Sequence, residues 1–177
     1  MSEASQQPMG QRFYPDTIPP FEYEPTRDRF SIPADPRFGE GVVSLVPFSK
    51  GDIVFAFTGF FSAQVTQFSL QVRKDLHLHD PYFYGKILHS CQPNTRVYPG
   101  KRQFIAVRSI EPGQYVTMDY AQTEDFLFRT FECGCGSRRC RGFVTGKKQR
   151  NPAAKQPILH PGYIPLPAVI GESMRTG

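Results

Sequence analysis

A mostly β protein of short strands and long loops is predicted by the composition and by the apolar patterning. The chain has 177 residues, of which 17 are Pro and 15 are Gly, a content that disfavours a helical bundle. Hydrophobic residues make up 39% and aromatic residues 14%, too much for a disordered chain. At this length we expect one domain with terminal extensions.

Short apolar runs bounded by turn residues predict the strands. They cover residues 42–46, 53–57, 68–72, 76–79, 104–107 and 115–118, and the last two are separated by a Glu111-Pro112-Gly113 turn. His77 and His79 fall on one face of the 76–79 strand, and we expect them to be exposed. A single helical turn is expected, near Thr123–Phe128.

Proline-rich segments flank this strand-rich body. We interpret residues 1–27 as an extended or disordered arm and residues 147–177 as a basic, Pro-rich tail. The net charge is +5, and from Phe131 onward 8 basic residues face only 2 acidic ones. Such an end is compatible with nucleic-acid, nucleosome or acidic-peptide partners, and equally with a solvated tail. Direct nucleic-acid binding and the oligomeric state stay open.

No membrane segment is expected. Residues 53–72 are uncharged over a membrane-spanning length, but they contain three Gln and several Ser and Thr, too polar for a lipid-facing helix. The N-terminus lacks the charged and apolar regions of a secretory signal, so we expect an intracellular, cytoplasmic protein, with a nuclear location also compatible.

Four cysteines carry the clearest chemical signal. Cys133, Cys135 and Cys140 share a Gly-rich loop, and Cys91 is the fourth. Neighbouring residues in a Cys-x-Cys pair rarely bridge each other, because the ring would be strained. Four thiolates suit one tetrahedral structural zinc, and three nearby Arg would offset its surplus negative charge. Four free thiols, or two disulfides in a secreted chain, are the alternatives.

Four motifs in fixed order carry a family resemblance. Gly39-Glu40-Gly41 comes first, followed by Leu88-His89-Ser90-Cys91-Gln92-Pro93-Asn94, then by residues 111–120 ending in Asp119-Tyr120, and last by the Cys133–Phe143 loop. In this combination the chain resembles a short, single-domain SET-domain protein, with the SET domain over residues 28–130 and a post-SET zinc segment over residues 131–146. The resemblance implies a mostly β fold, a β-clip with a pseudoknot and few short helices.

The resemblance also implies an activity and a set of site residues. Members of the family methylate protein lysines with S-adenosylmethionine, so the expected partner is a protein carrying a target lysine, a histone or another basic protein. Tyr120 matches the catalytic tyrosine. The residues expected at the cofactor are Glu40, Gly41, Leu88, His89 and Phe143, with Phe143 covering the adenine; Phe57 and Met118 are expected in the substrate channel; and Cys91, Cys133, Cys135 and Cys140 are expected to bind one zinc ion.

Three positions depart from the family pattern. Leu88 stands where Asn usually helps to hold the cofactor, Phe57 where a Tyr commonly bonds the target amine, and Met118 where Phe or Tyr is usual. Three functions therefore remain in competition: a protein-lysine methyltransferase, a methyltransferase for a small-molecule or carrier-bound amine, and a SET-fold binding module without turnover.

Overall fold

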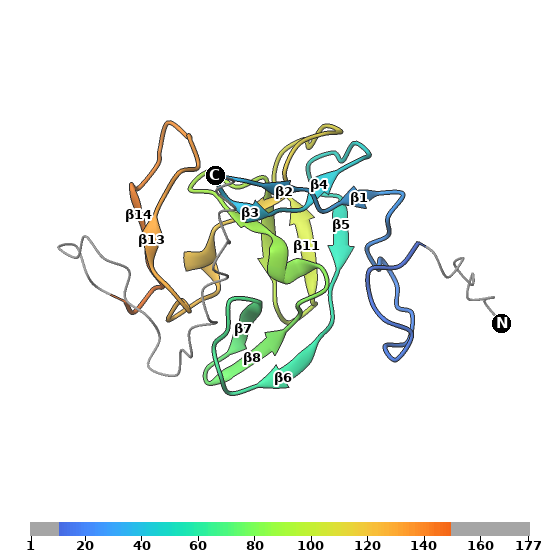
Figure 1. Cartoon of the computed structure of the whole chain (residues 1–177), viewed down its shortest axis with the longest axis horizontal. Helices are drawn as coiled ribbons and strands as arrows, with labels where there is room; N and C mark the ends of the chain where they lie inside the picture. The colour runs from blue at the N-terminus through green and yellow to red at the C-terminus, as the bar shows by residue number, and fades with distance from the viewer. Residues whose placement is uncertain (1–10, 150–177) are drawn as a thin grey trace, which may run out of the picture.

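Small sheets joined by long loops form the body of the protein. The computed structural model describes residues 11–149 (Figure 1). Fourteen strands lie in this range: β1 Phe30–Ser31, β2 Ala34–Asp35, β3 Gly39–Glu40, β4 Val43–Ser44, β5 Ile53–Ala56, β6 Phe60–Ser62, β7 Ser69–Arg73, β8 Leu76–His79, β9 Leu88–His89, β10 Thr95–Tyr98, β11 Gln103–Ala106, β12 Thr117–Met118, β13 Phe131–Glu132 and β14 Phe143–Val144. Two 3₁₀ turns, η1 Tyr84–Lys86 and η2 Tyr120–Gln122, are its helical segments. Neither is long or apolar enough to cross a bilayer.

Two three-stranded antiparallel sheets make the framework. One has the order β10-β11-β5 and the other the order β6-β8-β7. Strands β7 and β8 are joined by a two-residue loop in which Asp75 adopts a positive φ of 54°, a conformation that Asp and Asn adopt more readily than most residues. The pairs β1-β4, β2-β3 and β13-β14 are antiparallel, whereas β9 and β12 pair in parallel across the centre. In Figure 1, β13 and β14 lie at one end of the molecule and residues 11–27 at the other.

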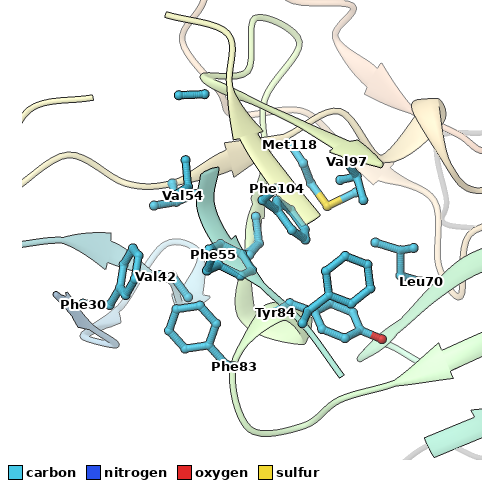
Figure 2. Close-up of a cluster of buried hydrophobic side chains, with 14 of the residues drawn as sticks. Phe30, Val42, Val54, Phe55, Leu70, Phe83, Tyr84, Val97, Phe104 and Met118 are labelled. Carbon is cyan, nitrogen blue, oxygen red and sulfur yellow. The ribbon is translucent and has the colours of Figure 1, made fainter. Parts of the chain in front are cut away.

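Aromatic rings fill the core between these sheets. Phe55 stacks on Phe104 at 4.4 Å between ring centroids, and Phe83 meets both Phe55 and Phe30 edge-on. Each of these four rings is 1% exposed or less (Figure 2). Burying a side chain of this size contributes about 1.5–3 kcal/mol, so this cluster holds the small sheets together.

The predicted strands correspond to β4, β5, β7, β8, β11 and β12, with ends shifted by a few residues. The predicted turn is also confirmed: the Gln114 amide donates to the Glu111 carbonyl and Gly113 has φ 87°, a type II geometry that favours glycine.

The helical turn predicted near Thr123–Phe128 is wrong. The 3₁₀ turn lies at Tyr120–Gln122, where the Asp119 side chain accepts from the Ala121 amide. The carbonyls of Glu124 and Asp125 instead accept hydrogen bonds from the amides of Lys147 and Lys148, so they do not form the hydrogen bonds of a helix.

The first described residues pack against the body, whereas an extended or disordered arm was predicted over 1–27. Tyr14 is 3% exposed, and its hydroxyl donates to the buried carboxylate of Asp80 at 2.7 Å. Arg12 pairs with Glu24 at 2.7 Å, and the amide of Ala56 in β5 donates to the Tyr23 carbonyl. Residues 11–27 therefore belong to the folded body. Residues 1–10 and most of the predicted tail, 150–177, lie outside the described range.

Candidate active site

A cavity of about 1010 Å³ opens where β9 and β12 run side by side. This is at the upper end of the range for small-molecule sites. Its wall comes from β3, the segment before β7, η1 and β9, the end of β12 with η2, and the segment leading to the cysteine loop. Lining residues from these parts include Glu40, Leu70, Tyr84, Leu88, His89, Met118, Tyr120, Glu124, Phe131, Cys133 and Cys135.

Asn94 stabilises the β9–β12 crossing, which is the place where these two strands pair in parallel. Its side-chain amide donates to the Tyr115 carbonyl at 2.8 Å, and its side-chain oxygen accepts from the Thr117 amide at 2.8 Å. Asn94 is 5% exposed, so these bonds are formed away from water. They align β12 beside β9 and bring Tyr120 to the cavity.

Tyr120 is anchored at both ends. Its hydroxyl donates to the Ile87 carbonyl at 2.7 Å, and its amide donates to Nδ1 of His89 at 3.2 Å. Burial, with a contribution from the charge of Glu124, raises the pKa of Tyr120 well above its usual range. The side chain therefore stays protonated, and its hydroxyl is held in place by the bond to Ile87.

His89 connects Tyr120 to the cysteines. The His89 side chain is 2% exposed, and burial lowers the pKa of the ring to about 4 in spite of the nearby carboxylate of Asp119. The neutral ring accepts from Tyr120 at Nδ1, which leaves the proton on Nε2, 3.4 Å from Sγ of Cys91. The resemblance placed His89 at the cofactor; in the structure its side chain also connects Tyr120 to Cys91.

The four cysteines come together as predicted. Their sulfur atoms all lie within 4.8 Å of one another, and Sγ of Cys91 is 3.7 Å from Sγ of Cys133. Four sulfurs at 2.3 Å from a tetrahedral zinc are about 3.8 Å apart, so the spacing fits that metal. The amides of Arg141 and Gly142 point at Cys91 and Cys140, at 3.3 and 3.4 Å, as they would toward thiolates. All four are free cysteines, which excludes the disulfide alternative in this structure.

The cavity brings together most of the predicted site residues. Glu40, Leu88, His89, Met118 and Tyr120 line it. Gly41 lies directly behind this wall: a Cβ on it would stand 2.8 Å from side-chain atoms of Leu88 and Tyr115, so a side chain here would displace the wall.

Phe57 and Phe143 are likewise absent from the lining, as are two of the predicted zinc ligands, Cys91 and Cys140. Phe57, expected in the substrate channel, is 1% exposed and packs in the core against Tyr84 and Phe104 at 4.8 and 5.4 Å. Tyr84 lies between it and the cavity and forms the wall. Phe143, expected over the adenine, pairs in β14 with Glu132, whereas Phe131 of the neighbouring strand β13 lines the cavity.

Phe131 lines the cavity and is among the residues that the sequence interpretation missed. Its ring centroid lies 6.1 Å from those of both His89 and Tyr120. Its position two residues before Cys133 was a usable signal. Lys86 was also missed: it lines the cavity and forms an ion pair with Glu40. Glu124, which is buried and also lines the cavity, was missed as well and had no local signal.

The fold has close counterparts among solved structures. KRYPTONITE in complex with mCHG DNA and SAH superimposes with a TM-score of 0.54 at 24% sequence identity, covering 65% of this chain and 29% of that one. A second KRYPTONITE complex, with mCHH DNA, H3(1-15) peptide and SAH, gives 0.55 at 21% identity. The fold is that of a SET domain. The predicted mostly β SET architecture is thus confirmed.

Sequence relatives agree with this assignment. The chain is 28% identical over 141 residues to the histone-lysine N-methyltransferase ash1 of Drosophila melanogaster, covering 63% of this chain and 6% of the relative. It is 38% identical over 73 residues to the H3 lysine-36 specific histone-lysine N-methyltransferase of Yarrowia lipolytica, covering 38% and 9%. The SET chain thus spans less than a tenth of the length of either relative. No sequence-family profile matches it.

Proposed function

We propose that this SET domain transfers a methyl group from S-adenosylmethionine to the side-chain amine of a protein lysine. The observation that carries the proposal is Tyr120, whose protonated hydroxyl is fixed in a ligand-sized cavity at the β9–β12 crossing. The sequence relatives are histone-lysine methyltransferases, and the structural neighbours hold SAH.

Several lining residues fit the cofactor. A purine would find apolar and aromatic surface on Leu88, Phe131 and the backbone of His89. Because Gly41 has no side chain, Leu88 and Tyr115 can pack closely against its backbone and complete this wall. When bound, the cofactor supplies a methyl group on a positively charged sulfur. Tyr120 orients the reacting atoms, because its hydroxyl cannot turn away from Ile87 without losing a hydrogen bond. Tyr84 and Met118, 3% and 4% exposed, keep water from the reaction centre.

Zinc would stabilise this arrangement. Cys91, Cys133, Cys135 and Cys140 would hold the ion, and two of these ligands, Cys133 and Cys135, also line the cavity. Through Cys91 and His89 the metal site is connected to the Tyr120 backbone. Metal binding is therefore expected to order both the cavity wall and the catalytic tyrosine.

The acceptor we favour is a histone tail. One structural neighbour was solved with an H3(1-15) peptide, and the relatives are named for histone lysines. A histone substrate favours the nuclear location that the sequence interpretation also allowed, and the cytoplasmic location expected from the sequence is not supported.

The deciding experiment follows labelled methyl from S-adenosylmethionine into core histones and into the protein and small-molecule fractions of a lysate. We expect label in protein lysine. Tyr120→Phe should lower the single-turnover rate by about 10²–10³, while calorimetry shows cofactor affinity nearly unchanged. Tyr98→Phe, at an exposed tyrosine of β10, is the matched control.

Other outcomes identify the competing functions. Label confined to the small-molecule fraction would assign a small amine as acceptor. Cofactor binding without transfer to any acceptor would assign a binding module. Full turnover by Tyr120→Phe would show that Tyr120 is not the catalytic tyrosine.

A further inference from the structure

Glu124 is a buried acid in the wall of the cavity. It is 5% exposed, and its amide donates to the Tyr120 carbonyl at 3.0 Å, so its backbone is tied to the catalytic turn. Carboxylate oxygen Oε1 accepts from the Gln71 amide of β7 at 2.7 Å and from the Thr123 hydroxyl at 3.0 Å. These contacts hold the carboxyl group between η2 and the β6-β8-β7 sheet.

The second oxygen is not satisfied. Oε2 of Glu124 is buried and has no hydrogen-bond partner within residues 11–149; Nδ1 of His77 is 3.8 Å away, beyond hydrogen-bonding distance. A buried carboxylate oxygen without a donor is costly. Glu40 and Glu132, the other acidic side chains in the cavity lining, are exposed. Glu124 is therefore the one buried acid in the lining, and its Oε2 atom can accept a hydrogen bond from a further donor.

The groups around Glu124 set its charge near neutral pH. Burial raises the pKa of Glu124 to about 7, and Asp125 adds to the rise, while the Gln71 amide, the Thr123 hydroxyl and Lys147 oppose it. His77 faces the Glu124 carboxyl group from β8. After burial, the charge of Glu124 contributes to the raised pKa of Tyr120, and after burial and Asp80 it contributes to the raised pKa of Tyr84. The carboxylate is thus electrostatically coupled to the hydroxyls of Tyr84 and Tyr120, and both of these residues line the cavity.

A lysine acceptor arrives with the wrong charge for methyl transfer. Its pKa is about 10.4, so on the order of one amine in a thousand is neutral at pH 7.4. Methyl transfer needs the lone pair of the neutral amine. A pocket for lysine therefore gains from a group that first attracts the ammonium and then takes its proton.

We infer that Glu124 is that group: its carboxylate attracts the lysine ammonium into the cavity and accepts the proton that the amine must lose, directly or through one water. The inference rests on the proposed function. The ammonium N–H bond breaks, the proton joins Oε2, and the electron pair stays on nitrogen. That pair then forms the bond to the methyl carbon while the carbon–sulfur bond breaks toward sulfur. Glu124 afterwards returns its proton to solvent.

The first test is the pH dependence of kcat/KM for the H3 residues 1–15 peptide in the wild type and in Glu124→Gln. In the wild type the value should rise to about pH 7 and stay flat between pH 8 and 9, because Glu124 ionises while the substrate remains ammonium. Without the carboxylate, the rate should follow the free amine and rise about tenfold per pH unit over the same range.

The Gln variant is expected to fold. Its side-chain oxygen can accept from the Gln71 amide as before, and its NH₂ can face Nδ1 of His77. A matched control is Asp75→Asn, which removes a charge from the same sheet at an exposed positive-φ position that Asn tolerates. The control should keep the wild-type pH profile.

The second test needs no turnover. Calorimetry of peptide binding at pH 7, in two buffers with different ionisation enthalpies, counts protons released. The lysine peptide should displace about half a proton from wild-type Glu124, which is half protonated at this pH. A norleucine-substituted peptide should release none and bind more weakly, and Glu124→Gln should release none with either peptide.

The results separate this inference from the proposed function. An active wild type whose plateau persists in Glu124→Gln, or whose rate rises without a plateau, would overturn the role of Glu124 and leave the methyltransferase intact. Equal proton release and affinity for the lysine and norleucine peptides would also overturn it. Loss of transfer to every protein acceptor would instead refute the proposed function.

Discussion

Tyr14→Phe tests whether residues 11–27 are part of the folding unit. The substitution removes one hydroxyl that donates at 2.7 Å to Asp80, a carboxylate with 0% exposure. The other acceptor contacts of Asp80, from the amides of Tyr82, Phe83 and Tyr84, remain. Hydrogen bonds to charged groups contribute about 1.5–3 kcal/mol, and we expect the free energy of unfolding to fall by that amount.

Urea unfolding followed by circular dichroism measures the loss, with an unchanged m-value. Tyr23→Phe is the matched control, because Tyr23 lies in the same segment with 42% exposure, and it should change stability by less than about 0.5 kcal/mol. Burial raises the pKa of Asp80 and the Tyr14 hydroxyl lowers it, so the variant should raise it further. Equal losses in both variants, or no loss in Tyr14→Phe, would refute the packing of this segment.

Three further outcomes are expected. Elemental analysis of protein purified under reducing conditions should find about one zinc per chain, and a chelator should increase amide exchange over residues 131–146 and weaken cofactor binding; folded, cofactor-binding protein without zinc would contradict this. Gly85→Ala places a Cβ 2.2 Å from the Asp80 carbonyl oxygen, so thermal unfolding should show a loss of about 1–3 kcal/mol, against little change for Gly100→Ala, where nothing lies within 4 Å. The pKa of Glu124 rises from 4.5 to about 7 on folding, so its stabilising contribution is complete below pH 4.5 and is lost as the pH rises through 7; Glu124→Gln should remove about 3 kcal/mol of that pH dependence, and identical stability–pH curves would refute it.

Local patterns in the sequence were sufficient for some features. The apolar runs predict β5, β7, β8 and β11, because strand periodicity is a local property. The cysteine spacing predicts a cluster that the structure confirms, because thiolates at those positions have one joint use. Tyr120 and His89 meet in one cavity as the motif order implied.

Other features depended on pairings between distant residues. Tyr14 contacts Asp80 across 66 positions, and the composition of residues 11–27 carries no trace of it. The rings of Phe57 and Tyr84 likewise pack against each other, and Tyr84 is the one that lines the cavity. The sequence does not show which of two adjacent aromatic rings faces a cavity. The exposure expected for His77 was wrong for the same reason: Glu124 closes over it from a remote segment, leaving it 5% exposed.

The parallel pairing of β9 with β12 has a consequence for the order of folding. During synthesis, Leu88 and His89 leave the ribosome well before Thr117 and Met118. Strand β9 therefore stays unpaired until β12 has been synthesised. The hairpins β7-β8 and β10-β11 can form meanwhile from local contacts. Pairings with large sequence separation form slowly. A nascent chain is therefore expected to form these hairpins first. The cavity forms last, when Asn94 makes its hydrogen bond to the Thr117 amide of β12.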